Sequence, residues 1–235
     1  MVRSKFGLKA LSLCLAVAGL MAFVTSSAQA EVGARWMVSG QNIEAGKAGA
    51  TPVKASIENE TASLLTTILG IATKILCKQV ELVGVSLENE GAVTKGGKAK
   101  LSNCAIYLEG SSTASAPCLP KTAGVNDIIE TSKGKGLLVL FGGVGETLLR
   151  AEEEGKPLVV TESSAECAVG QKINITGEII LKDCGAGKVT EEKKVHLLEM
   201  DTVNSTLKAS GQKAIIDGSV NLETTTGVVW NGLPA

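Results

Sequence analysis

Aromatic side chains are scarce in this sequence, and histidine is scarcer still. Phe, Trp and Tyr together make up 3% of the 235 residues, and there is one His. Many ligand sites are built on aromatic faces, and His is the most frequent general acid or base in enzymes. Because 44% of the chain is hydrophobic, it folds, and its core must come mainly from Val, Ile, Leu and Ala.

An excess of charge of either sign is also lacking. The chain has 23 Lys and Arg against 24 Asp and Glu, which gives a formal net charge of -1. Proteins that bind duplex nucleic acid neutralise its phosphates with clustered Lys and Arg. Nucleic acid is therefore not expected as a partner.

Motifs for metals, phosphates and nucleophiles are missing too. Zinc sites use Cys or His pairs about two to four residues apart, and calcium loops alternate Asp and Asn before a closing Glu. Neither pattern occurs, nor does the Gly-x-Ser-x-Gly turn of many hydrolases. The glycines of residues 142–145 lack the strand and helix context of a phosphate-binding loop. We expect no metal, no cofactor and no enzymatic activity.

The single histidine, His196, lies in a strand-like run from Lys193 to Leu198. A Ser or Cys nucleophile would need this imidazole as its base, but nothing in the spacing supplies a partner. We interpret His196 as a structural residue. A hydrolase that uses His196 or a pair of acids is the least favoured class of function.

The first thirty residues read as a signal peptide. Arg3, Lys5 and Lys9 are followed by an uncharged stretch from Ala10 to Val24 and by the small-x-small triplet of residues 28–30. The uncharged stretch is shorter than the roughly 20 apolar residues that span a bilayer, which disfavours an uncleaved anchor. We predict cleavage after residue 30, no membrane span in the mature chain, and a secreted or cell-envelope location, periplasmic or extracellular.

Beyond the signal, the sequence predicts a mainly β protein. Short runs of Val, Ile, Leu and Thr are separated by turn residues at intervals of roughly 8 to 12 residues, which is typical of an antiparallel β-sandwich or a partly open barrel. The candidate strands cover residues 35–38, 53–57, 63–69, 73–82, 98–108, 136–141, 158–162, 172–181, 194–198, 214–216, 220–223 and 228–230.

A helix remains an alternative to strand in two segments. Residues 62–76 could form one, although Gly70 interrupts the run and its β-branched residues favour strand. Residues 150–155 could hold a short helix before Pro157. We expect one β-rich domain over residues 31–235, with two packed layers, residues 31–120 and 121–235, as the alternative.

Five cysteines remain after signal removal, in a chain whose predicted compartment is oxidising. We expect two disulfides, and an odd count leaves one thiol unpaired. The pairs Cys104 with Cys118 and Cys167 with Cys184 are favoured because each closes a short loop, which leaves Cys77 as a buried free thiol. The main competitor joins Cys77 to Cys104.

The order of short motifs along the chain resembles a group of secreted bacterial proteins of unknown activity that are frequent in actinobacteria. The motifs are loose spacings of Cys, Gly and β-branched residues, in residues 36–46, 75–77, 101–104, 118, 135–139, 166–169, 175–179 and 216–220. Cys184 has no counterpart in this pattern. The resemblance implies secretion and β structure and adds no function.

Three classes of function remain. The first expectation is an exported, non-enzymatic protein with a structural or interaction role, whose partner is a cell-envelope or extracellular component. The alternative is a binding module for a small ligand or a polysaccharide, for which Trp36 and Trp230 are the candidate contact residues. A hydrolase comes third.

Overall fold

The computed structural model describes residues 34–43, 51–88, 93–141, 144–183 and 188–233. Within these ranges it is built from antiparallel strands and one short 3-10 helix, η1 (Ala116–Cys118). The first half of the strands comprises β1 (Arg35–Val38), β2 (Gln41–Asn42), β3 (Thr51–Ile68), β4 (Ile71–Cys77), β5 (Gln79–Val83), β6 (Ser86–Leu87), β7 (Val93–Ser102), β8 (Ala105–Leu108), β9 (Lys121–Thr122) and β10 (Val125–Asn126). The second half comprises β11 (Ile129–Glu130), β12 (Gly134–Phe141), β13 (Val144–Ala151), β14 (Val159–Glu162), β15 (Lys172–Thr176), β16 (Ile179–Asp183), β17 (Val195–Met200), β18 (Lys208–Ala209), β19 (Gln212–Thr224) and β20 (Trp230–Leu233). The predicted mainly β, antiparallel fold class is confirmed.

Alternating hydrophobicity explains why these segments are strands. In β15, Ile173 and Ile175 are buried, while Lys172 and Asn174, which alternate with them, are exposed. This period of two places one set of side chains on each face of a sheet. The segment that could have been a helix, residues 62–76, is the hairpin of β3 and β4.

The turn of that hairpin is set by two residues with positive φ. Leu69 has a φ of 51° and Gly70 has a φ of 82°, the pattern of the two-residue turn that matches the twist of a hairpin. The possibility of a second helix, over residues 150–155, was wrong. Arg150 lies in β13, whose hydrogen bonding to β12 and β16 keeps the backbone extended, and a turn follows it.

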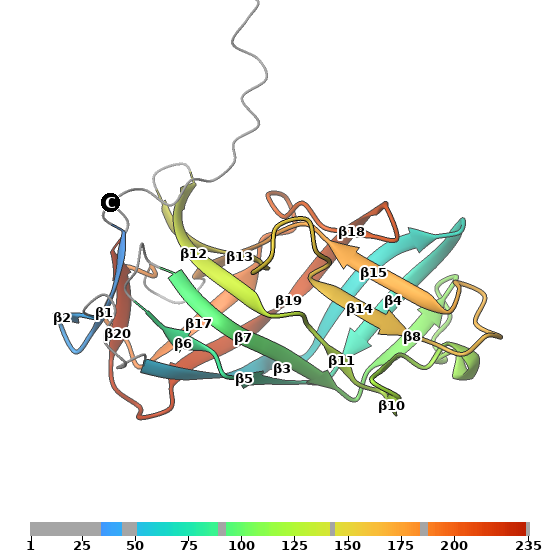
Figure 1. Ribbon diagram of the computed structural model, residues 1–235, viewed down its shortest axis with the longest axis horizontal. Coiled ribbons are helices and arrows are strands. Elements are labelled where there is room, and N and C mark those ends of the chain that lie inside the picture. The colour runs from blue at the N-terminus through green and yellow to red at the C-terminus, as the bar shows by residue number, and fades with distance from the viewer. Residues whose placement is uncertain (1–33, 44–50, 89–92, 142–143, 184–187, 234–235) are drawn as a thin grey trace, which may run out of the picture.

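The sheets curve around a common interior in a sandwich-like arrangement. One series of pairings runs from β3 through β6, β7, β12, β13, β16, β17 and β19, and β19 pairs with β3. Strands β14, β15 and β18 extend from β19 at the other half of the molecule, and β4 carries β8. Figure 1 shows these strands crossing the elongated body obliquely.

Two long strands join the halves of the molecule. β3 and β19 pair from Thr66 opposite Ala214 to Val53 opposite Thr224, with one irregularity between Asp217 and Ser219. Segments from the start and the end of the chain therefore form one continuous wall.

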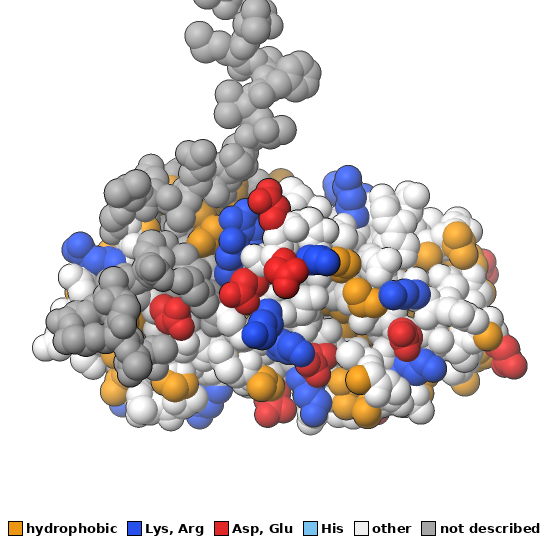
Figure 2. Space-filling view, viewed as in Figure 1, with side chains coloured by type: hydrophobic (Ala, Val, Ile, Leu, Met, Phe, Trp, Pro, Cys, Tyr) orange, Lys and Arg blue, Asp and Glu red, His pale blue; other side chains and the backbone are white. Residues whose placement is uncertain are grey.

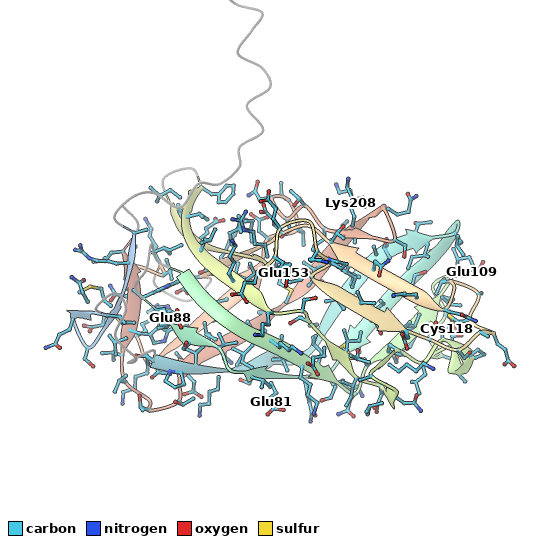
Figure 3. The ribbon with its side chains drawn as sticks, in the orientation of Figure 1. Glu81, Glu88, Glu109, Cys118, Glu153 and Lys208 are labelled. Atoms are coloured by element: carbon cyan, nitrogen blue, oxygen red, sulfur yellow. A yellow bond between two sulfur atoms is a disulfide. The ribbon has the colours of Figure 1, made fainter. Side chains whose placement is uncertain are left out.

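The two ends of the body are closed differently. β1 lies between β2 and β20 in a separate three-stranded sheet at one end (Figure 1). Helix η1 and β8 lie at the opposite end, where Figure 3 labels Cys118.

The cysteine pairing preferred from the sequence was wrong. Cys77 is joined to Cys104, and Cys118 is joined to Cys167. The first bridge, which the sequence offered as the competitor, forms because β4 and β8 pair with Leu76 opposite Ala105, so the two cysteines flank that pair. Cys77 is thus not a free thiol, and Cys184 lies outside the described residues.

Candidate functional site

An elongated cavity of about 270 Å³ lies between the inner faces of the sheets. On β3 its lining includes Val53, Ala55 and Ile57, and on β19 it includes Val220 and Leu222. These residues are spaced by two, so they are the inward half of each strand. The cavity is therefore a consequence of the same alternation that forms the sheets.

Outward neighbours confirm the direction of these side chains. Ser56, between two lining residues of β3, is exposed. On β5, Leu82 lines the cavity whereas Glu81 is exposed and points away from the body in Figure 3. The inner and outer faces thus differ sharply in polarity.

The cavity surface is almost wholly apolar. Thr147 is buried, and the Thr131 hydroxyl accepts a hydrogen bond from the Ala99 backbone N–H at 2.9 Å. Lys98 borders the cavity, but its ammonium group binds Glu130 at 2.6 Å. The lining therefore offers few polar partners to a molecule inside.

Several inward side chains are only half-buried although they belong to the interior face. They are Ile57, Val80, Leu82, Ile216, Val220 and Leu222. Well-packed protein cores leave few voids larger than a water molecule. Apolar surface thus remains uncovered along this interior.

Trp36 lies at one end of the cavity lining and is 2% exposed. The opposing backbone fits closely against it, because a Cβ atom on Gly232 would lie 2.8 Å from the Trp36 ring and 2.9 Å from Leu138. Gly232 therefore allows β20 to pack tightly on β1 above the indole ring.

The two tryptophans predicted as ligand contacts lie together. Their ring centroids are 5.7 Å apart, with the rings tilted by 59°. Trp36 borders the cavity, whereas Trp230 packs behind it, and its indole Nε1 has no hydrogen-bond partner among the described residues. The other aromatics among the described residues are elsewhere: Tyr107 is on β8, and Phe141 packs against a separate cluster around Leu148.

His196 supports this end of the molecule from within. Its Nδ1 is 2.5 Å from Asp183 Oδ2, and its Nε2 donates to the Trp230 carbonyl at 2.8 Å. The His196 ring also packs on the Trp230 ring, with centroids 4.0 Å apart. Both ring nitrogens are occupied, which leaves neither for a substrate and gives the residue a role in holding β17, β16 and β20 together.

Asp201, at the end of β17, organises the loop that follows. It accepts hydrogen bonds from the backbone N–H groups of Val203 and Asn204, from the Asn204 amide and from Lys182, whose Nζ lies 2.7 Å away. Burial alone would raise the pKa of Asp201, but these donors outweigh it and lower the pKa to about 2. The carboxylate is a structural anchor and does not reach the cavity lining.

Glu146 is the remaining buried acid with an altered titration. Burial raises its pKa, an effect that the charge of Lys182 opposes and that of Asp201 reinforces. Its Oε2 has no hydrogen-bond partner within the described ranges. Glu146 lies opposite Val139 in the pairing of β13 with β12. The neighbouring pair, Thr147 with Leu138, faces the interior, so Glu146 faces away from the cavity.

In the part of the chain that the structure describes, no group of three or more His, Cys, Asp or Glu side chains is arranged to hold a metal ion. No helix in the same residues is long and apolar enough to cross a membrane. No protein-family model, curated protein sequence or solved structure matches this chain. The two disulfides fit a location outside the cytoplasm.

Sequence reasoning found Trp36 but missed the rest of the cavity lining. Ala55, Ile57 and Leu222 looked like ordinary core positions, since alternation identifies an inward side chain without showing what lies opposite it. The signal that could have drawn attention to them is the shortage of large aromatic side chains to fill a wide β interior.

Proposed function

We propose that this protein is an exported, non-enzymatic binding protein that holds one small apolar molecule in its interior. The observation that carries the proposal is the apolar cavity of about 270 Å³. A cavity of roughly 150 Å³ lined by aliphatic and aromatic residues is enough to bind benzene. The space here is therefore sufficient for a larger hydrocarbon ligand.

The chemistry of the lining favours an apolar ligand over a sugar. Each hydroxyl of a sugar that loses water without gaining a hydrogen bond costs on the order of 1–3 kcal/mol. A hydrocarbon instead gains about 25 cal/mol for each Å² of apolar surface that it buries. Within the ligand-binding class, this contrast supports a small apolar molecule rather than a polysaccharide.

The outer surface suits a protein that is exported and stays soluble with its cargo. Figure 2 shows Lys and Arg side chains mixed with Asp and Glu over the middle of one face. Mixed charge over a face of a protein keeps it from associating through that face. A purely structural or display role needs the same surface but gives no reason for an open apolar interior.

The test is saturable binding of a slender apolar dye, the rod-shaped polyene diphenylhexatriene, to protein purified after export, whose intact mass also shows whether it starts at Glu31. We expect Ile57→Trp, which fills the cavity from its inner face, to weaken binding about tenfold or more. Ser56→Trp adds the same side chain to the outer face of the same strand and should bind like the unaltered protein.

Two results would contradict the proposal. One is a folded protein that shows no saturable dye binding. The other is equal binding by both variants, each with an unchanged circular dichroism spectrum, because dye on the outer surface would not distinguish Ile57 from Ser56.

A further inference from the structure

We infer that the apolar molecule is a single unbranched hydrocarbon chain, such as the acyl chain of a lipid, lying lengthwise in the cavity. The inference rests on the proposed function and adds the class of ligand. It follows from the length of the cavity, the width of its cross-section, called the bore below, and the uniformity of its wall.

The cavity extends through both halves of the molecule. Its lining includes Trp36 and Leu87, which belong to the hydrophobic cluster at the tryptophan end. It also includes Cys77 and Ile175, which belong to the separate cluster that contains the disulfides. One continuous space therefore connects two cores that otherwise pack independently.

The length of that space can be taken from β3. Its lining residues run from Val53 to Leu64, which at about 3.3 Å per residue covers roughly 35 Å of strand. Strands that curve around an interior are inclined by about 35–45° to its long axis. The cavity is therefore on the order of 25 Å long.

The bore is narrow for that length. A compact cavity of about 270 Å³ would take a small fused-ring molecule. Dividing the same volume by a length on the order of 25 Å gives a mean cross-sectional area of roughly 10 Å². This is the area within which the centre of a water-sized group can lie. That section fits hydrocarbon carbons in single file and suits a slender chain better than the broad plate of a rigid polycycle.

The wall is almost wholly apolar, and its few polar residues are Ser63, Lys98, Thr131, Lys135 and Thr147. Small side chains occur at both halves of the bore, Ala55 opposite Leu222 on β19 and Ala62 opposite Cys77 on β4. A chain of repeated methylenes matches such a wall, because every segment makes the same kind of contact.

The experiment compares palmitate, the shorter acid decanoate and the rigid polycycle cholesterol by displacement of diphenylhexatriene from the exported protein. Each methylene that the bore buries should tighten binding about fourfold. Palmitate should therefore bind at least about a hundredfold more tightly than decanoate, and cholesterol should displace the dye poorly.

Two narrowing variants test whether the chain uses the whole length. Ala55→Phe obstructs the tryptophan half, and Ala62→Phe obstructs the disulfide half. Each should weaken palmitate binding about tenfold or more while decanoate, which fits in the other half, changes by about twofold or less. The ratio of the palmitate affinity to the decanoate affinity within one variant is independent of how much of the protein is folded. The matched control is Thr67→Phe, which places the same side chain at an exposed position of β3.

The outcomes separate the two proposals. If cholesterol binds as well as palmitate, or if palmitate is indifferent to one of the narrowing variants, the chain inference is overturned and the binding function stands. If neither acid nor cholesterol displaces the dye, the chain inference also fails. If the dye itself does not bind, the proposed function fails with it.

Discussion

The two ends of this protein are held together by different chemistry. At one end, Trp36, Trp230 and the only histidine pack beneath a three-stranded sheet and are tied by hydrogen bonds. At the other end, two disulfides cross a cluster of aliphatic side chains. Both sets of residues are scarce in the sequence, and both are concentrated where the strands finish and a curved sheet needs to be closed. Rare residues thus mark the ends of the interior, whereas the wall between them is made from common aliphatic ones.

The largest effect is expected from breaking the tryptophan end. His196→Ala would take the ring partner away from the Asp183 carboxylate, which is 1% exposed. It would also remove one of the two donors to the Trp230 carbonyl, which would keep the backbone N–H of Lys193 at 3.1 Å. Removing one partner of a buried pair costs about 3–5 kcal/mol of unfolding free energy. Urea denaturation measures the loss, and Val195→Ala, at an exposed position of the same strand, should change stability by no more than about 0.5 kcal/mol. A loss that small for His196→Ala would mean that the pair does not hold this end.

The stability of the disulfide end should depend only weakly on loop length. The Cys118–Cys167 bridge spans 49 residues, and the Cys77–Cys104 bridge spans 27. The chain-entropy relation assigns them about 4 and about 3.5 kcal/mol. Replacing each pair by alanines and measuring unfolding in guanidinium should therefore give two similar losses, the longer loop slightly the larger. A pair that can be removed without loss would show that the sheet alone closes this end.

The smallest effect on the free energy of unfolding is expected from Asp201, away from the two ends' tryptophans and disulfides, and this effect depends on pH. The pKa of Asp201 is about 2 in the folded protein and lies below the ordinary 3.8. Its stabilising contribution is therefore complete above about pH 4 and is lost as the pH falls towards 2, which amounts to about 2 kcal/mol. Asp201→Asn should remove this dependence, so the gap in unfolding free energy between the two proteins should shrink over that interval. A gap that changes by less than about 0.5 kcal/mol between pH 5 and pH 2 would contradict the assignment.

Much of the fold could be predicted from the sequence, because alternation and turn residues act locally. Gly70 marked the turn between β3 and β4, and the β-branched residues around it favoured strand over helix. The limits of strands were less predictable. β3 joins the two expected strands, residues 53–57 and 63–69, into one strand from Thr51 to Ile68, because its pairing with β19 and β4 supplies hydrogen bonds for polar as well as apolar residues.

The disulfides and the cavity could not be predicted, because both depend on contacts between distant segments. Spacing alone favoured short loops, but the register of β4 against β8 brings Cys77 to Cys104, and the hydrogen bond from Ser164 to the Pro117 carbonyl ties the segments that carry the second bridge. The partner of His196, Asp183, likewise becomes a neighbour through the pairing of β16 with β17. A void needs still more information, since it depends on how far apart two opposite walls lie.

The pairing of β3 with β19 also determines how fast the protein can fold. Val53 meets Thr224 and Thr66 meets Ala214, so a wall strand near the start of the chain is completed only by a strand near its end. Bringing such distant segments together costs loop-closure entropy before any contact repays it, and β proteins with this contact order fold in about milliseconds to seconds. We expect hairpins such as β3 with β4 to form first, because their strands are adjacent in the sequence, and to present unpaired edges until β19 pairs with β3. During that interval the protein is at its most prone to aggregation, and a chaperone that covers the edge of β3 would have the greatest effect on its yield.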